Sequence, residues 1–135
     1  RGFDYYYDQI VCSGELLSSV ILSAYFNESG IRNTWVDVRD ILRTDNRFRN
    51  ASIDWSFTQE KVNTTIIPLF DASDIVVTQG FIGATAENES STLGPEGSDY
   101  SAAVFANMLQ ASELKIWEDS EGVAKPIPKN FPEKE

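Results

Sequence analysis

The sequence predicts an α/β fold built on a largely parallel sheet, and two observations carry this prediction. Segments with helical spacing of apolar residues alternate along the chain with short apolar runs that are typical of strands. Such alternation favours helices packed on the faces of a mainly parallel sheet. The 135 residues, 41% hydrophobic and 24% charged, suffice for one domain with its own core. We therefore expect a single domain over residues 1–135.

The first half of the chain predicts one long helix and two short strands. Residues 14–28 show helical spacing, and Gly30 follows as a C-terminal cap. Residues 35–38 predict a strand, 39–43 a brief helical turn and 51–55 a candidate strand. The side chains expected to face inward from the first helix are Leu16, Leu17, Val20, Ile21, Ala24 and Tyr25.

The middle of the chain predicts a weaker helix, a strand and a polar loop. Residues 57–70 are rich in β-branched side chains, and Pro68 interrupts the helical hydrogen bonds. Residues 74–78 are continuously apolar, as expected of a strand covered on both faces. Residues 84–92 are polar and lack a hydrophobic period, which is typical of a hairpin tip or a mobile loop.

The C-terminal third predicts one strong helix and a further strand. Residues 98–110 form the helix, and its expected inward side chains are Ala102, Phe105, Ala106 and Leu109. Residues 114–117 predict a buried strand. The tail from residue 118 carries three prolines and is expected to be irregular.

Charge and composition exclude several function classes. The formal net charge of −10 disfavours nucleic acid or an anionic membrane as a partner, and a nucleotide would need Mg²⁺ or a few basic residues. No apolar run approaches the length of a membrane span.

Cys12 is the only cysteine, which predicts a core residue in a reducing, cytoplasmic setting. Histidine is absent, which excludes catalytic triads and most zinc sites, and we predict no metal ligands in the chain.

Two glycine-containing loops are the most informative feature of the sequence. The first follows the apolar strand in VTQGFIG at residues 77–83, and the second opens a helix in TLGPEGSDYSA at residues 92–102. Glycine lets the backbone approach a ligand closely, and the start of a helix gathers unpaired N–H groups. The two loops therefore predict a site for a small anion, although no standard nucleotide-binding motif is present.

Five residues are candidates for chemistry, and four of them also have a purely structural explanation. Ser98 and Asp99 begin a helix, where Ser is a common cap and Asp complements the dipole. Glu15 lies in the first turn of the 14–28 helix, where an acidic residue is merely favourable. Phe81 follows a strand as an apolar wall or a loop anchor. Asp119 follows the predicted strand 114–117, and ligands of open α/β sheets bind at such strand ends.

Six segments in order resemble the aspartate kinases, members of the amino acid kinase family. The resemblance covers residues 9–129 and rests on SGELLS at 13–18, WVDVR at 35–39, RTDNRF at 43–48, the two glycine loops, and Ile116-Trp117 with Asp119 and Gly122. It implies a three-layer α/β/α sandwich with a mainly parallel sheet, incomplete in this chain. It also implies phosphoryl transfer from ATP with Mg²⁺ to the β-carboxylate of L-aspartate, the first step of lysine, threonine and methionine biosynthesis.

The resemblance also implies site residues and an assembly. Glu15, Phe81, Ser98 and Asp99 would bind aspartate, with Asp99 as the catalytic residue. Glu118, Asp119 and Lys129 would lie on the nucleotide side. ATP and L-aspartate would be the small-molecule partners, without nucleic acid or membrane, and the protein would be a homo-oligomer.

The sequence departs from the family pattern on the ligand side. Pro95 stands where the family has an arginine that grips the aspartate carboxylate, and proline supplies neither charge nor an N–H group. Ala124 replaces a tyrosine that contacts the nucleotide, and Ile127 begins the counterpart of an Asp-Pro-Arg motif. No segment corresponds to the family's N-terminal Lys-Phe-Gly-Gly-Thr-Ser.

We therefore expect the central part of an aspartate kinase catalytic domain, without regulatory ACT domains and inactive as an isolated chain. The alternative is a degenerate kinase-like module that does not catalyse and binds a ligand or a protein partner.

Overall fold

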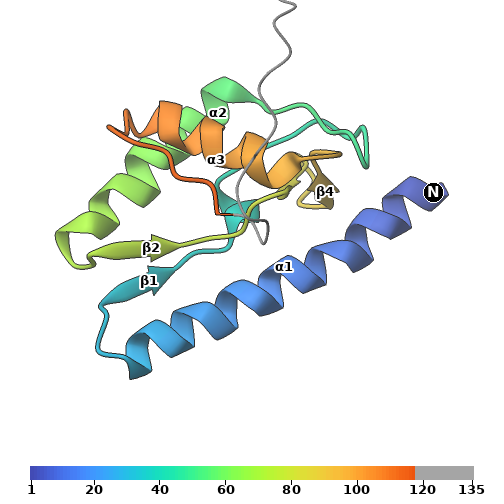
Figure 1. Cartoon of the computed structure of the whole chain (residues 1–135). Coiled ribbons are helices and arrows are strands. Elements are labelled where there is room, and N and C mark those ends of the chain that lie inside the picture. The colour runs from blue at the N-terminus through green and yellow to red at the C-terminus, as the bar shows by residue number, and fades with distance from the viewer. Residues whose placement is uncertain (118–135) are drawn as a thin grey trace, which may run out of the picture.

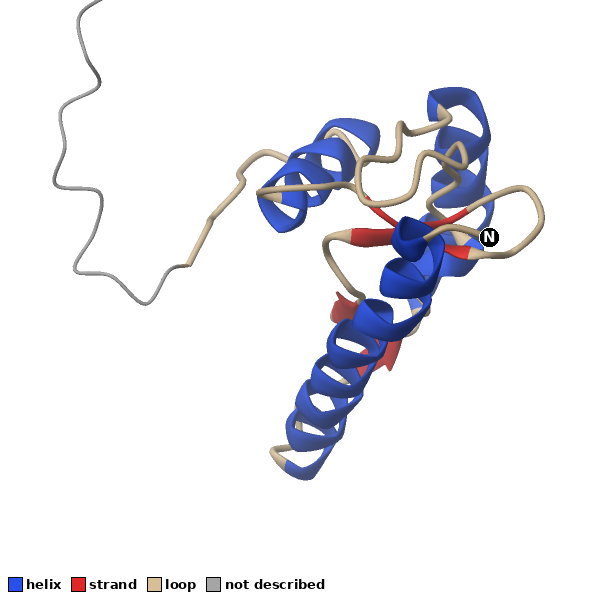
Figure 2. Ribbon diagram, turned by 90° about the vertical axis from the view of Figure 1, so that its right-hand side faces the viewer, coloured by secondary structure: helices blue, strands red, loops and turns tan. Residues whose placement is uncertain are grey.

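The computed structural model describes residues 1–117 (Figure 1). Figure 2 shows the helices and the short strands by colour. The elements in chain order are α1 (Phe3–Glu28), β1 (Asn33–Trp35), the 3-10 helix η1 (Val38–Asp40), α2 (Trp55–Lys61), the π-helical η2 (Val62–Ile66), the 3-10 helix η3 (Ile67–Asp71), β2 (Ile75–Val77), β3 (Ile82–Ala84), β4 (Ser90–Thr92) and α3 (Gly97–Met108).

The strands form two small sheets, one parallel and one antiparallel. β1 and β2 pair in parallel with Thr34 opposite Val76, and α1 lies on one side of this pair with α2 and α3 on the other (Figure 1). β3 and β4 form an antiparallel hairpin with Gly83 opposite Ser91. The predicted α/β class with a parallel pairing is thus confirmed, and the polar segment 84–92 is the hairpin turn with its second strand.

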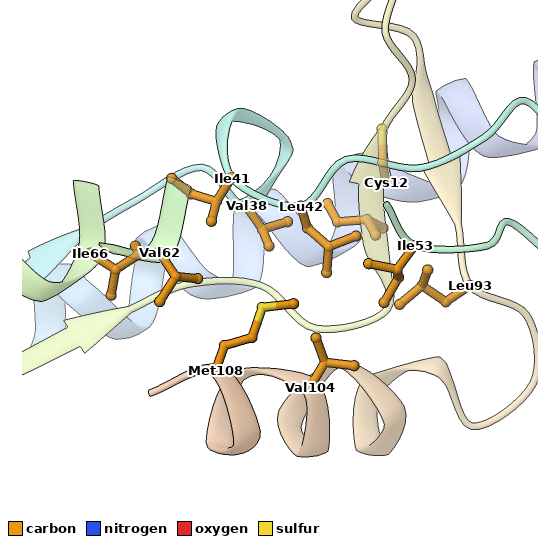
Figure 3. Packing of buried hydrophobic residues seen from close by; sticks show 11 residues of the cluster. Cys12, Val38, Ile41, Leu42, Ile53, Val62, Ile66, Leu93, Val104 and Met108 are labelled. Atoms are coloured by element: carbon orange, nitrogen blue, oxygen red, sulfur yellow. The ribbon is translucent and has the colours of Figure 1, made fainter. Parts of the chain in front are cut away.

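The core lies between η1, the hairpin, α2–η2 and α3 (Figure 3). Val38, Leu42 and Val62 are fully buried at its centre, and Met108 closes it from α3. Cys12 is 3% exposed and contributes from α1, as the sequence predicts for a small packing residue. This core places the ends of β2 and β4 beside the start of α3.

Helix α1 contradicts the sequence prediction in its length and in the face that it buries. It begins at Phe3 rather than at residue 14. The buried residues of α1 are Asp8, Cys12, Ser19 and Ser23, whereas Leu17, Ile21 and Tyr25 are about 60% exposed. The polar side chains turn inward because they have partners there: the Ser19 hydroxyl accepts a hydrogen bond from Trp35 Nε1 at 2.9 Å, and Ser23 donates one to Asn33 at 2.5 Å. Gly30 is at φ +76° and ends the helix, as predicted.

Helix α1 is long enough and apolar enough to span a membrane, judged by length and composition alone. The sequence pattern had predicted no apolar segment of that length. An 18-residue window within α1 has a mean hydropathy of 1.3 with 17% of the window buried. The polar residues interrupt every apolar run, but the Ile, Val and Leu between them raise the average. In the described structure, the polar face of α1 packs on β1 and β4.

Three further predictions are corrected by local capping and pairing. β1 ends at Trp35 rather than at residue 38, because the Asp37 carboxylate accepts the Arg39 N–H and begins η1. Residues 51–55 form no strand beyond a single bridge at Ile53, because Asp54 caps α2 and the helix begins at Trp55. Residues 114–117 are exposed and unpaired, since no strand of the described chain lies beside them.

The helical predictions for residues 57–70 and 98–110 are confirmed with changes in detail. The first is helical throughout, but it changes from α to π at Val62 and to 3-10 at Ile67, beside Pro68. In α3 the most buried side chains are Ser101, Val104 and Met108. The expected inward residues Ala102, Phe105, Ala106 and Leu109 are only half-buried.

Candidate functional site

The first glycine loop joins β2 to β3 and turns sharply just before β3. Phe81 adopts a left-handed backbone with φ +71°, which is uncommon for a residue with a side chain. Gly80, the residue before Phe81, packs closely on α3, because a Cβ at this position would lie 3.1 Å from Ser98 Cα. The absence of a side chain at residue 80 therefore lets this loop touch the start of α3.

The second glycine loop joins β4 to α3 and closes onto the first. Gly94 and Glu96 are both left-handed, at φ +86° and +57°. A Cβ on Gly97 would lie 2.8 Å from Phe81 Cδ2, so the Phe81 ring rests directly on this glycine. The two loops, predicted to be close in sequence only, are in contact in space.

A hydrogen-bonded serine and a buried glutamine fix the loops to the fold. Ser101 Oγ accepts the Phe81 N–H at 3.1 Å and donates to the Ser98 carbonyl at 2.9 Å. Gln79 is 3% exposed; its amide donates to Ser19 Oγ at 2.7 Å, and its oxygen accepts the Val38 N–H at 2.8 Å. The base of the first loop is therefore tied to α1, η1 and α3 at once.

A small groove of about 280 Å³ opens over the contact of the loops. It brings together Phe81 and Ser98, two of the residues predicted to bind substrate. The other lining residues are Tyr7, Arg49, Thr92, Gly94, Pro95, Glu96 and Gly97. Its volume is near the lower limit of small-molecule sites, about 300 Å³, which suits a ligand of amino-acid size better than a nucleotide.

A larger, mostly apolar groove of about 730 Å³ lies on the other side of Ser98. Asp99 lines this groove together with Ser98, the half-buried face of α3 and the end of β2. Lys115 supplies the only cation among its described lining residues. Ser98 thus lines both grooves, whereas Asp99 lines only the larger one.

The structure does not bring every predicted site residue to these grooves. Glu15 is half-buried on α1 and lines neither of them. The predicted nucleotide-side residues Glu118, Asp119 and Lys129 lie outside the described residues, as do Ala124 and Ile127. Their roles remain predictions.

Two residues that the sequence prediction missed support the small groove. Asp8 is fully buried on α1; its carboxylate accepts the Arg49 N–H at 2.9 Å, the Thr92 N–H at 2.8 Å and the Thr92 hydroxyl at 2.9 Å. Arg49 lies in the loop before α2 at φ +64°. One signal could have found Asp8, because it lies one helical turn before the buried Cys12, on the same face. No local pattern marks Arg49.

An ion pair beside the hairpin fixes the turn after β1. The Arg39 guanidinium bonds the Asp37 carboxylate at 2.6 Å and reaches Ser90 Oγ at 3.2 Å. Although burial acts to raise it, the pKa of Asp37 lies below its ordinary value because the side chain and backbone N–H groups of Arg39 donate to the carboxylate. The pair therefore joins η1 to β4, the strand that leads into the second loop.

The chemistry available in the small groove is binding of a small polar anion. Ser98 brings a hydroxyl, Arg49 a guanidinium, and the loop a glycine-rich backbone that a ligand can approach. Among the described lining residues, these groups can position a ligand and neutralise its charge.

Comparisons with known proteins agree on one group of enzymes. The sequence model of the amino acid kinase family matches residues 3–135. Lysine-sensitive aspartokinase 3 of Escherichia coli (strain K12) is 37% identical over 116 residues, which are 86% of this chain and 26% of that protein. Bifunctional aspartokinase/homoserine dehydrogenase 1, chloroplastic, of Arabidopsis thaliana is 32% identical over 93% of this chain and 14% of its own length.

Solved structures give the same result. E. coli aspartokinase III in complex with aspartate and ADP superposes with a TM-score of 0.80 and 35% identity, over 84% of this chain and 25% of that one. The same enzyme in complex with lysine and aspartate matches equally well. The chain thus spans about a quarter or less of the length of these relatives.

Proposed function

The chain belongs to the amino acid kinase family, and on this premise we propose that its described residues form the acceptor side of an aspartate kinase. Such an enzyme transfers the γ-phosphoryl group of ATP, bound with Mg²⁺, to the β-carboxylate of L-aspartate. The observation that carries the proposal is that Phe81 and Ser98, from two separate loops, line one groove of amino-acid size. The aspartokinase names of relatives that are 31–37% identical support it.

The proposed reaction suits the residues that the chain has. Phosphoryl transfer to a carboxylate needs the two substrates held in line and their charges neutralised, without a covalent nucleophile. A chain without histidine, whose one cysteine is buried, can therefore take part. The small groove would hold the amino acid, with its β-carboxylate on the side of Ser98, which lines both grooves.

A second candidate function is binding of the amino acid without phosphoryl transfer. The observation that favours it is Pro95, which lines the small groove and supplies no charge and no N–H donor. The two candidates share the ligand and differ only in turnover.

Calorimetric titration of the chain with L-aspartate tests both candidates at once. We expect saturable binding of L-aspartate and weaker binding of succinate, which lacks the ammonium group. The same samples with MgATP are then assayed for ADP and for acyl phosphate trapped with hydroxylamine. Aspartate-dependent acyl phosphate would support the kinase against the second candidate, and absence of aspartate binding would contradict both. Binding without acyl phosphate fits both candidates, because the chain by itself is expected to be inactive.

A further inference from the structure

The small groove contains one cation among its described lining residues, and that cation is Arg49. The one anion in the same lining is Glu96, which lies on the second loop beside Pro95. L-Aspartate, the acceptor in the proposed function, carries two carboxylates and one ammonium group. A groove that binds it needs a positive group for the carboxylate that does not react.

The backbone of Arg49 is held at the groove by a buried carboxylate. Asp8 accepts the Arg49 N–H at 2.9 Å in a partly buried contact, and the Asp8 side chain itself is fully buried. The second loop packs on the same peptide: a Cβ on Gly94 would lie 3.1 Å from the Arg49 carbonyl oxygen. Arg49 therefore cannot move away from the groove without breaking the packing of the loop that forms it.

Arg49 occupies a backbone conformation that favours another residue. At φ +64° a glycine would be unstrained, whereas an arginine is strained because its Cβ crowds the backbone. A strained residue that is held in place by a buried partner is a reasonable candidate for function. Because the backbone at this position favours glycine, the reason for an arginine lies in its side chain.

The guanidinium of Arg49 makes two weak contacts, with the ring of Tyr7 and with the carboxylate of Asp4, and neither prevents it from binding a ligand. Its Cζ lies 4.7 Å from the ring centre of Tyr7, which also lines the groove. One nitrogen pairs with Asp4 at 3.1 Å, and the two side chains are 48% and 59% exposed. Such an exposed pair holds its partners loosely, and a guanidinium has five N–H donors, so several remain for a ligand.

We propose that Arg49 binds the α-carboxylate of the acceptor amino acid in the small groove. The assignment to the α-carboxylate follows from the reaction, because the β-carboxylate must face the nucleotide and keep its electrons for the attack on phosphorus. Arg49 thereby supplies the positive charge that Pro95 cannot. This inference rests on the proposed function, since it takes L-aspartate as the ligand.

The experiment measures L-aspartate affinity of the full chain by calorimetry in four variants. Arg49→Gly removes the guanidinium, keeps the N–H that Asp8 accepts and relieves the left-handed strain, so it should fold at least as well as the wild type. We expect Arg49→Gly and Arg49→Gln to weaken L-aspartate binding roughly 10- to 100-fold, as for loss of a charge-assisted hydrogen bond. Arg47→Gln is the matched control, because Arg47 pairs with Asp45 outside the groove, and its affinity should stay within about twofold. Asp4→Asn removes the competing anion and should tighten binding.

The α-amide of L-aspartate then identifies the group that Arg49 binds. The amide lacks the α-carboxylate, so its affinity should be equally low in the wild type and in Arg49→Gly. Three results would overturn the assignment: unchanged L-aspartate affinity in Arg49→Gly, an equal loss in Arg47→Gln, or a loss for the α-amide as large as for L-aspartate. Each of these leaves the proposed function standing, whereas no L-aspartate binding by the wild type overturns the proposed function and this inference with it.

Discussion

The hydroxyl of Ser101 accepts the backbone N–H of Phe81 at 3.1 Å, across 20 positions of sequence. The same hydroxyl donates to the Ser98 carbonyl at 2.9 Å. A single side chain on α3 thus holds the turn of the first glycine loop and the first turn of the helix that the second loop opens. The shape of the small groove depends on this contact, because Phe81 and Ser98 form part of its wall.

Replacing Ser101 with alanine should loosen the first loop. The Phe81 N–H loses its partner in a partly buried position, which should lower the free energy of unfolding by about 1–2 kcal/mol. Urea unfolding measures this change, and amide hydrogen exchange should show faster exchange at Phe81. Ser18→Ala is the control, since the exposed Ser18 bonds only a carbonyl of its own helix. An equal effect of the two variants would contradict the role given to Ser101.

Alanine at Gly83 and at Gly14 should change stability in opposite directions. A Cβ at Gly83 would meet Leu42 Cδ2 at 2.6 Å and the Leu42 carbonyl oxygen at 2.8 Å, and a backbone oxygen cannot move cheaply. Gly83→Ala should cost about 1–3 kcal/mol. Gly14 lies within α1 with nothing within 4 Å of its position for a Cβ, so Gly14→Ala should add about 0.5–1 kcal/mol. Thermal unfolding of both variants checks the signs.

The Asp37–Arg39 pair should stabilise the fold at neutral pH and not in acid. The pKa of Asp37 is lowered in the folded chain, so the folded state holds the charged form more strongly than the unfolded state does. Its contribution is therefore present above the unfolded pKa of about 3.9 and is lost as pH falls through the folded pKa. Asp37→Asn should cost about 1 kcal/mol at pH 7, and the difference from the wild type should shrink below about pH 4.

Asp74→Asn is the matched control for this pH series. Asp74 pairs with Arg32, but both side chains are more than 60% exposed, and such pairs contribute little. We expect a pH-independent difference below about 0.5 kcal/mol. A cost at Asp37 that persists undiminished at pH 3 would show that packing, and not charge, explains the effect.

Replacing Gln79 with methionine tests the anchor at the base of the first loop. The change preserves side-chain size but leaves the Val38 N–H without its buried acceptor, so we expect a loss of roughly 2–3 kcal/mol. Gln59→Met serves for comparison, because the Gln59 amide lies at a partly exposed site and bonds Asn63 and the Met108 carbonyl. Chemical denaturation of the two variants should separate them by more than 1 kcal/mol.

Local signals in the sequence were enough for several elements of the fold. The strand at β2, the cap at Gly30 and the presence of helix α3 each depend on neighbouring residues only, and all three predictions are confirmed, although α3 buries Ser101, Val104 and Met108 most deeply. The closeness of the two glycine loops along the chain was read from the sequence, whereas their contact in space comes from the structure. Function at Phe81 and Ser98 was predicted through resemblance and still awaits a binding experiment.

The buried face of α1 and the contribution of Arg49 could not be predicted in this way. Helical spacing favours the apolar face of α1, but Ser19 and Ser23 face inward because Trp35 and Asn33 offer hydrogen bonds there. Those partners are not adjacent in sequence. Arg49 reaches the groove through a left-handed backbone that depends on Asp8, 41 positions earlier. Tertiary partners decided both outcomes, and no periodicity encodes them.

The carboxylate of Asp8 has a consequence for the order in which the chain folds. Its partners lie 41 and 84 positions further along the chain, whereas the paired residues of the β3–β4 hairpin are at most ten positions apart. Short-range contacts form before long-range ones, because closing a long loop costs more entropy. Asp8 is synthesised 84 residues before Thr92, so its carboxylate has no Thr92 partner until that part of the chain has been made. The part of α1 around Asp8 should therefore dock only after β4 has formed, whereas the part around Ser19 and Ser23 can dock earlier on Trp35 and Asn33.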